Sequence, residues 1–220
     1  MHTIFDFFNR LSRNNNREWF NTHKDEYMQL RAQWIDDVQR FINIISESWP
    51  EIRYTEAKRC TYRIYRDTRF SPDKTPYKTH IGSFIVPRKD IPAAGLYLHA
   101  GIIPAENGIY TGIWHPEPAQ LKKLRRAIDT NSEEWLGIVE NPAMSAAFDG
   151  WFGDAVKTAP KGYDKNHPLI KYLRLKDIGV FAHIPDSAFT DHSWVNIAAD
   201  KAKAALPLGN FINYSLTEDV

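Results

Sequence analysis

The sequence predicts an α+β fold, in which an antiparallel sheet of four to six strands is flanked by N-terminal and C-terminal helices. Two observations support this prediction. Apolar residues recur at intervals of three or four in the first 48 residues and again after residue 116, which is typical of amphipathic helices. Between these regions, residues 58–114 contain short apolar runs separated by glycine and proline, which is typical of strands and turns.

Three helices are expected before the sheet. Residues 3–12 and 17–23 form two short helices, and the asparagines at 14–16 between them are expected to cap helix ends. Contact of these asparagines with a ligand is the alternative. Residues 24–48 form the longest helix, with Trp34 on its apolar stripe and Pro50 at its end. We therefore expect Trp34 to be buried in the core.

Strands are expected at residues 58–66, 79–87, 95–103 and 107–114, with a further strand at 178–184. The pair Asn107-Gly108 is a hairpin signal, so the strands at 95–103 and 107–114 should be antiparallel. Alternation in the first strand would place Tyr62 and Ile64 on one face and Arg63 and Tyr65 on the other. Glycines in these strands mark places where a helix or ligand approaches closely.

Helices also follow the sheet. Pro116 and Pro118 open one, and Asn131 and Asn141 precede two more. A short helix at 169–174 and a helix at 192–205 come later, and Pro207 is expected to end the latter before a last helix at 208–216. Without repeats or linker-like segments, residues 1–220 are predicted to form a single domain.

Charge and cysteine content limit the class of protein. The 28 Lys and Arg residues nearly balance 27 Asp and Glu residues, which argues against a generic coat for nucleic acid. The single cysteine, Cys60, excludes an internal disulfide and fits a reducing compartment. The first residues do not resemble a signal peptide, and no apolar run is long enough to cross a membrane. We therefore expect a cytoplasmic protein without a membrane partner.

The stretch from residue 63 to residue 78 concentrates the most chemistry. Residues 58–80 hold seven Lys and Arg residues against two Asp residues. Arginine offers a planar fork for phosphate or carboxylate, lysine adds charge, and tyrosine adds a stacking face. The candidate ligand-binding residues here are Arg63, Arg66, Arg69, Lys74, Tyr77 and Lys78. The alternative is a network of salt bridges through Asp67 and Asp73 that only braces a loop.

A second basic stretch spans residues 157–176, with six Lys and Arg residues against one Asp residue. Its candidate ligand-binding residues are Lys161, Tyr163, Lys165 and His167. Pro168 at a helix start would leave backbone N–H groups free to hold an anion. The alternative is a solvated loop.

Familiar catalytic and cofactor motifs are absent. The sequence has no glycine-rich dinucleotide or P-loop motif, no nucleophile elbow and no zinc-protease motif. We therefore expect no cofactor and no metal, and the catalytic residues stay unknown. His80, His99 and His115 lie on or beside predicted strands, where hydrogen-bonded structure is the favoured interpretation and a metal site the alternative.

Three blocks of the sequence carry a resemblance to a known family. They are residues 14–20 (NNNREWF) with His23-Lys24 and Tyr27, residues 66–78 (RDTRFSPDKTPYK), and residues 160–176 with the run PKGYDK. Together they resemble the family called domain of unknown function 2461. The resemblance implies a single soluble domain, and it brings no established activity, so function has to be argued from the residues.

The leading hypothesis is a site for a phosphorylated or otherwise anionic ligand, formed where the two basic loops meet at one end of the sheet and share an anion. If the chemistry is phosphoester transfer or hydrolysis, His167 is the candidate acid or base; whether the protein is an enzyme is left open. One alternative is a nucleic-acid-binding module that uses the same groups. Another is a protein-interaction domain whose charged loops are structural. The oligomeric state is not indicated.

Overall fold

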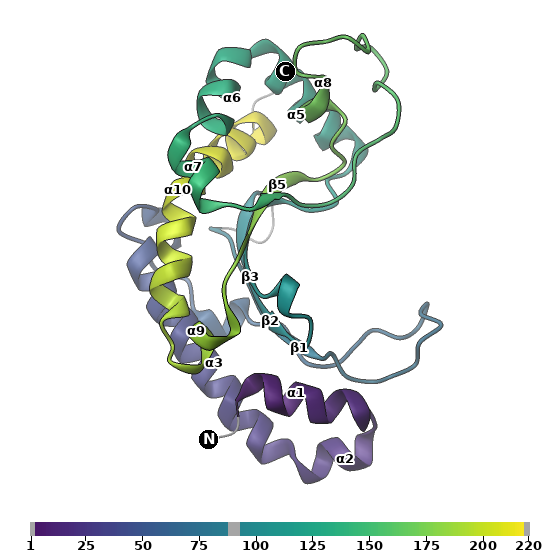
Figure 1. Cartoon of the computed structure of the whole chain (residues 1–220), viewed down its shortest axis with the longest axis vertical. Coiled ribbons are helices and arrows are strands. Elements are labelled where there is room, and N and C mark those ends of the chain that lie inside the picture. Colours follow the sequence, from purple (N-terminus) through teal and green to yellow (C-terminus); the bar gives the residue numbers. More distant parts are fainter. Residues whose placement is uncertain (1–2, 88–92, 218–220) are drawn as a thin grey trace. The chain divides into compact units, whose positions relative to one another are not determined.

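The computed structural model describes residues 3–87 and 93–217, which form helices at both ends of the chain and one sheet (Figure 1). The elements are α1 (Ile4–Arg13), α2 (Arg17–Thr22), α3 (Lys24–Ile45), the 3₁₀ turn η1 (Pro50–Ile52), α4 (Ala57–Cys60), β1 (His80–Ile85), β2 (Gly95–Gly101), the 3₁₀ turn η2 (Pro104–Glu106), β3 (Gly108–Ile113), α5 (Pro118–Thr130), α6 (Ser132–Val139), α7 (Pro142–Ala147), β4 (Gly150–Trp151), α8 (Ile170–Leu173), β5 (Ile178–His183), α9 (Asp186–Thr190) and α10 (Trp194–Thr217).

The sheet is antiparallel and has five strands in the order β1-β2-β3-β5-β4. This confirms the predicted α+β class. Four of the expected strands are present, because β1, β2, β3 and β5 fall within the ranges 79–87, 95–103, 107–114 and 178–184. The short strand β4 joins the edge through a register that pairs Gly150 with Phe181 and Trp151 with Val180.

The chain divides into two compact units that are not contiguous in sequence. Unit 1 comprises residues 1–85, 97–109 and 183–199, and unit 2 comprises residues 86–96, 110–182 and 200–220. Four of the five boundaries fall inside β2, β3, β5 and α10, and the fifth follows directly after β1. The prediction of a single domain is untested by this division and stays a prediction.

Unit 1 begins with three helices whose ends are fixed by polar side chains. Thr3 accepts a hydrogen bond from the Asp6 N–H and caps α1, while Asn16 accepts one from the Trp19 N–H and caps α2. Asn14 donates its side-chain amide to the Arg10 carbonyl. These contacts support the predicted capping role of the asparagine run, since Asn14 and Asn16 serve α1 and α2.

Trp34 connects α3 to the rest of unit 1. Its side chain is 4% exposed, which confirms the predicted burial. The indole stacks on Trp194 at 5.0 Å between centroids, and its N–H donates to Ser83 Oγ at 2.9 Å. The Ser83 hydroxyl in turn bonds the Thr61 hydroxyl at 2.9 Å. A buried indole therefore has its polar atom satisfied, which avoids the cost of an unpaired donor.

Unit 2 has its own core. Ile113 of β3 and Ile178 and Val180 of β5 pack in one cluster with side chains from α5, α6, α8 and the second half of α10. Trp135, which is fully buried, lies in this cluster. Arg125 of α5 donates to the carbonyls of Leu173 and Leu175 and so fastens the chain around α8.

The predicted strand at 58–66 is wrong. Residues 57–60 form the helical turn α4, and the following residues make only two isolated bridges, Thr61 with Ser83 and Tyr65 with Tyr77. The expected alternation fails as well, because Ile64 is buried while Tyr62 is 48% exposed. After the bridge from Thr61 the segment leaves the sheet and forms the first arm of a hairpin. Its residues border no continuous sheet face, so alternation along the sequence does not predict which side chains are buried.

The predicted break at Pro207 is also wrong. Helix α10 continues through Pro207 to Thr217, so no separate helix forms at 208–216. Proline removes one backbone hydrogen bond and crowds the preceding turn. In this helix, burial of Leu208, Phe211 and Ile212 in the core of unit 2 outweighs that local cost.

Across the described residues, no helix has both the length and the apolar content needed to span a membrane.

Candidate functional site

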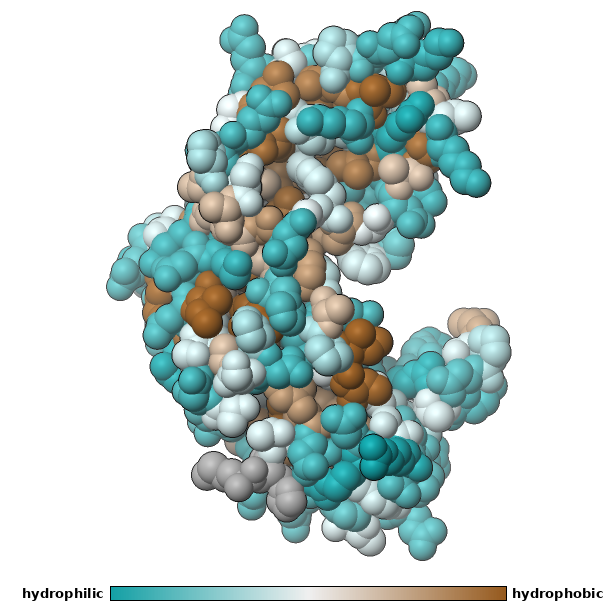
Figure 2. All heavy atoms as spheres, viewed as in Figure 1, coloured by the Kyte–Doolittle hydropathy of each residue, from teal (hydrophilic) through white to brown (hydrophobic). Residues whose placement is uncertain are grey.

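Residues 65–77 form a hairpin in unit 1 that extends away from β1 (Figure 1). The Arg66 N–H donates to the Pro76 carbonyl and the Lys78 N–H donates to the Ile64 carbonyl, which closes the base. Asn15 holds the returning arm, because its side chain donates to the Tyr77 carbonyl and accepts from the Tyr77 N–H. Asn15 therefore has a structural role, because it holds the returning arm of the hairpin in place. The surface of this hairpin carries mostly hydrophilic side chains (Figure 2).

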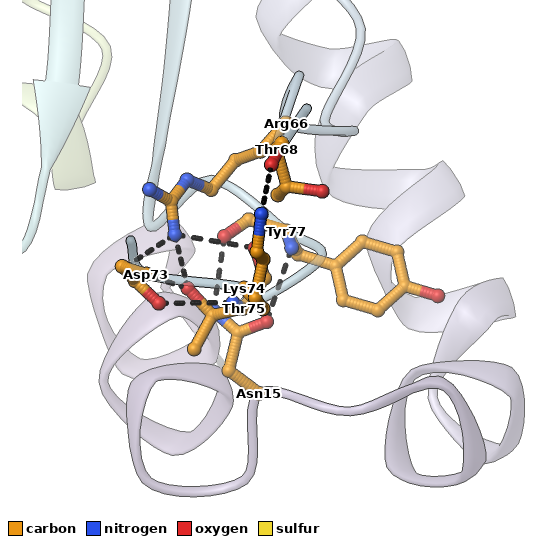
Figure 3. A network of polar contacts seen from close by, with 7 residues as sticks. All are labelled: Asn15, Arg66, Thr68, Asp73, Lys74, Thr75 and Tyr77. Atoms are coloured by element: carbon orange, nitrogen blue, oxygen red, sulfur yellow. Dashed lines mark hydrogen bonds and ion pairs between the residues drawn. The ribbon is translucent and has the colours of Figure 1, made fainter. Parts of the chain in front are cut away.

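The Arg66 guanidinium is directed back into the hairpin (Figure 3). It donates to Asp73 Oδ2 at 2.5 Å, to the Thr75 carbonyl at 3.2 Å and to the Thr75 hydroxyl. Asp73 also accepts from the Thr75 N–H at 2.9 Å. This backbone hydrogen bond, followed by the bond from Arg66, lowers the pKa of the Asp73 carboxyl. Arg66 thus closes the turn between residues 66 and 75.

Two more of the predicted ligand-binding cations are also engaged inside the hairpin. Arg69 makes a two-pronged contact with Asp67, at 3.0 Å and 2.7 Å, and its hydrogen bonds lower the pKa of that carboxyl. The Lys74 ammonium donates to the Thr68 carbonyl at 2.8 Å (Figure 3). These contacts are those of the alternative interpretation, in which Asp67 and Asp73 brace the loop.

Tyr77 does not form a wall of an open site. Its side chain is 3% exposed, and its ring stacks on Phe20 of α2 at 4.2 Å between centroids. The hairpin is thus anchored to the helical part of unit 1 through Tyr77 and Asn15. A residue expected to contact a ligand serves to attach the loop.

Arg63 and Lys78 differ from the three braced cations. Within the described residues, neither side chain makes a hydrogen bond or an ion pair with a carboxylate. The Lys78 ammonium lies 5.2 Å from the centre of the Tyr62 ring. Burial, and then the nearby charge of Arg63, lower the pKa of the Lys78 ammonium. Lys78 is therefore a cation that lies beside an exposed tyrosine ring and has no carboxylate partner in the described chain.

A pair of histidines lies near Lys78. The rings of His80 on β1 and His99 on β2 are 4.6 Å apart, and His99 Nδ1 shares a hydrogen bond with the Tyr97 hydroxyl at 3.0 Å. Burial lowers the pKa of each histidine to about 4; the charge of Lys78 adds to this for His80 and the charge of His80 for His99. Both imidazoles are therefore neutral at pH 7.

Gly82 makes room for this cluster. A Cβ at Gly82 would lie 2.5 Å from the Tyr97 hydroxyl, so a side chain there would displace the tyrosine. The glycine thus marks a close approach, but the group that approaches is a tyrosine ring of the neighbouring strand and not the helix or ligand that the sequence suggests. From the sequence, His80 and His99 were expected to be hydrogen-bonded structure or a metal site and not part of the anion site. The signal that could have placed them there is their position on strands that pair directly.

The second basic loop belongs to unit 2 and is held by its own contacts. His167 Nδ1 accepts a hydrogen bond from the Leu169 N–H at 3.1 Å, which leaves Nε2 to donate to Asp129 at 2.9 Å. Tyr163 lies edge-on to the His167 ring at 5.9 Å. Both ring nitrogens of His167 are therefore engaged, and this ring takes one of the backbone N–H groups expected to hold an anion.

Lys161 and Lys165 are exposed, and neither makes a hydrogen bond or ion pair within residues 3–87 and 93–217. The loop that carries them lies in unit 2, whereas the hairpin lies in unit 1. The prediction that the two loops share an anion stays a prediction. Among the described residues of the first loop, Arg63 and Lys78 have no carboxylate partner, and the charge of Arg63 acts on the Lys78 ammonium.

No metal site accompanies these groups: in the described part of the chain, no set of three histidine, cysteine or acidic side chains is arranged to hold a metal ion. His115, which was considered with His80 and His99, lies in unit 2, where its backbone N–H donates to Asp177 at 2.6 Å.

Comparison with known proteins agrees with the sequence blocks around these loops. A family model described as a conserved hypothetical protein, DUF2461, matches residues 3–211. The chain belongs to the DUF2461 family. The match includes the hairpin, both histidines and the second loop. No curated protein and no solved structure matches the chain. The DUF2461 description states no activity, so the function is argued from the geometry above.

Proposed function

We propose that unit 1 binds a phosphorylated or otherwise anionic ligand, and that Arg63 and Lys78 hold the anion. The observation that carries the proposal is the position of these two cations. They lie close enough for the Arg63 charge to lower the pKa of the Lys78 ammonium, and neither has a carboxylate partner in the described chain. Like charges next to each other are unfavourable, and an anion between them reverses that cost.

The neighbouring groups support a ligand that is more than a bare ion. The exposed ring of Tyr62 offers a stacking face beside Lys78. The neutral ring of His80, which is partly exposed, can donate or accept a hydrogen bond without adding charge. A small molecule that carries one phosphate or carboxylate and a polar or planar body meets these groups.

Thermal unfolding in the presence of anions tests the proposal. Phosphate and pyrophosphate should raise the Tm above that in sodium chloride of equal ionic strength, because binding to the folded state stabilises it. Arg63→Gln and Lys78→Gln should each abolish most of that increase. Arg66→Gln should retain most of it, since the Arg66 side chain is engaged within the hairpin. Lys58→Gln, at an exposed lysine of α4, is the matched control.

Other outcomes favour the alternatives. If phosphate and pyrophosphate have no effect while a single-stranded oligonucleotide binds in a manner that depends on Arg63, the chain is a nucleic-acid-binding module. If no anion or oligonucleotide changes the Tm of the wild type, the proposal fails and the charged loops are structural.

A further inference from the structure

Aromatic side chains line the sheet face of unit 2 that points away from its core. Along β3, Tyr110 and Trp114 have the opposite parity to the buried Ile113, and along β5 Phe181 has the opposite parity to the buried Val180. A fourth ring comes from the residue that follows β4. The aromatic platform of unit 2 is the set Tyr110, Trp114, Phe152 and Phe181.

The four rings of the aromatic platform are in continuous contact. The Tyr110 ring lies 4.4 Å from the Phe181 ring and 5.9 Å from the Phe152 ring, measured between centroids. Trp114 stacks on Phe152 at 5.6 Å, and their planes are within 21° of each other. The Trp114 side chain is 60% exposed, and the other three residues are partly exposed. The platform therefore presents aromatic surface to a ligand.

Two features of the backbone hold the platform in place. A Cβ at Gly179 would lie 2.2 Å from a carbon of the Phe152 ring, so this glycine lets the ring lie directly against β5. His115, which follows Trp114, has a φ of 48°, a value that is uncommon for a residue with a side chain. Its N–H donates to the buried Asp177 carboxylate at 2.6 Å. An unfavourable conformation that is held beside an exposed tryptophan is typical of functional sites.

We propose that the aromatic platform binds the pyranose ring of a neutral carbohydrate. This site is separate from the anion site proposed for unit 1 and does not depend on it. The face of a pyranose ring presents C–H bonds with a small positive charge, and these pack against the negative face of an indole or phenyl ring. The hydroxyl groups at the edge of the sugar stay in water or bond to polar groups beside the rings.

The charges around the platform favour a neutral ligand. The platform is carried by three segments, residues 108–116, 149–155 and 176–182. These segments hold one lysine and no arginine against three aspartates, so a phosphate-bearing ligand such as a nucleotide lacks the cations that it needs. Lys176 pairs with Asp154 at 3.5 Å, and Asp177 holds the His115 N–H. Because these two carboxylates are already engaged, a neutral ligand is also favoured over a cation.

Saturation-transfer NMR tests the proposal with three defined probes. These are the tetrasaccharides of β-linked glucose, of α-linked glucose and of β-linked N-acetylglucosamine, each mixed with the full chain. When the aromatic protons of the protein are irradiated, the ring C–H protons of at least one tetrasaccharide should receive saturation. A tenfold higher sodium chloride concentration should leave this signal unchanged, because the contact involves no ion pair.

Variants then place the sugar on the platform. Trp114→Ala should reduce the saturation transfer several-fold, whereas Trp114→Tyr, which keeps an aromatic ring, should retain most of it. Tyr54→Ala, at a tyrosine of unit 1 that is 91% exposed, is the matched control and should have no effect. Trp114→Ala should keep the Tm of the wild type, since its side chain is mostly exposed. Unfolding would then not explain the lost signal.

Three outcomes would overturn the proposal. If no tetrasaccharide receives saturation, the platform is not a carbohydrate site. If a tetrasaccharide gives the same signal with Trp114→Ala as with the wild type, the sugar binds elsewhere. If adenosine gives a Trp114-dependent signal and no tetrasaccharide does, the platform stacks nucleobases and the carbohydrate assignment is wrong. Failure here leaves the anion site of unit 1 untouched, because any increase in Tm with phosphate should be the same in Trp114→Ala as in the wild type.

Discussion

His80 and His99 are neutral because burial withholds the water that a charged imidazole needs. A nearby charge also opposes protonation of each ring: the charge of Lys78 for His80, and the charge of His80 for His99. Glu106, at 4.0 Å from His99 Nε2, acts in the opposite sense. Tyr97 adds a hydroxyl to the same cluster. The folded chain therefore takes up protons at this pair only as the pH falls toward 4.

This pair predicts an acid-sensitive component of stability. The pKa of each ring is about 4 in the folded chain, below the ordinary value of 6.5. The unfolded chain binds more protons than the folded chain between these values, so the contribution is fully present above pH 6.5, falls as the pH drops toward 4 and levels off below it. The loss for the pair should be on the order of a few kcal/mol.

Denaturant melts at pH 7 and pH 4.5 measure this loss. The double variant His80→Gln and His99→Gln should lose less unfolding free energy between these pH values than the wild type, because glutamine does not bind a proton. Carboxylates elsewhere contribute equally to both proteins, so the difference reports the histidine pair. Equal losses in the two proteins would show that the histidines are not held neutral by the fold.

At the same scale, the sequence shows which residues carry charge but not which charges are already paired. The density of cations at residues 63–78 suggested six ligand-binding side chains. The structure engages Arg66, Arg69 and Lys74 with acceptors a few residues away. Such pairing depends on the turn geometry between residues 67 and 75, which a count of charges does not contain. The anchoring role of Tyr77 was not predicted for a related reason, because its partner Phe20 is 57 residues away in the sequence.

At the scale of elements, the spacing of apolar residues predicted helices and strands correctly where the element is long or borders a continuous core. Helix α3 and strands β1, β2, β3 and β5 lie close to their predicted ranges because each buries one stripe or face. The segment 58–66 lacks such a face, so its alternation predicted a strand that does not form. Pro207 predicted a helix end that does not occur, since the core contacts that keep α10 continuous come from strands and helices distant in sequence.

Pro207 therefore gives a prediction for α10. Pro207→Ala should stabilise the chain by about 1–2 kcal/mol, which is less than the ~3 kcal/mol that separates proline from alanine in a helix interior, because alanine also loosens the unfolded chain. The new N–H can donate to the carbonyl one turn earlier. Urea titration followed by circular dichroism measures the change. Destabilisation would mean that the packing of Leu208, Phe211 and Ile212 requires the local distortion that proline introduces.

At the scale of the whole molecule, the path of the chain links the stability of the two units. The chain passes from one unit to the other directly after β1 and then within β2, β3, β5 and α10. Unfolding one unit would therefore cut strands and a helix that the other unit uses. The backbone hydrogen bonds of these elements would be lost in both. This is the physical basis for keeping the single-domain prediction alongside the division into two units.

One cooperative transition is the expected result. In differential scanning calorimetry the chain should unfold in a single peak whose calorimetric and van't Hoff enthalpies agree, as for a two-state domain. Leu124→Ala, in the core of unit 2, should shift the whole peak to lower temperature, since emptying a fully buried leucine site costs roughly 2–5 kcal/mol. Ile42→Ala, at a fully buried site in unit 1, should shift the same peak in the same direction. A peak that splits, with one part moved by Leu124→Ala and the other by Ile42→Ala, would show that the two units unfold independently.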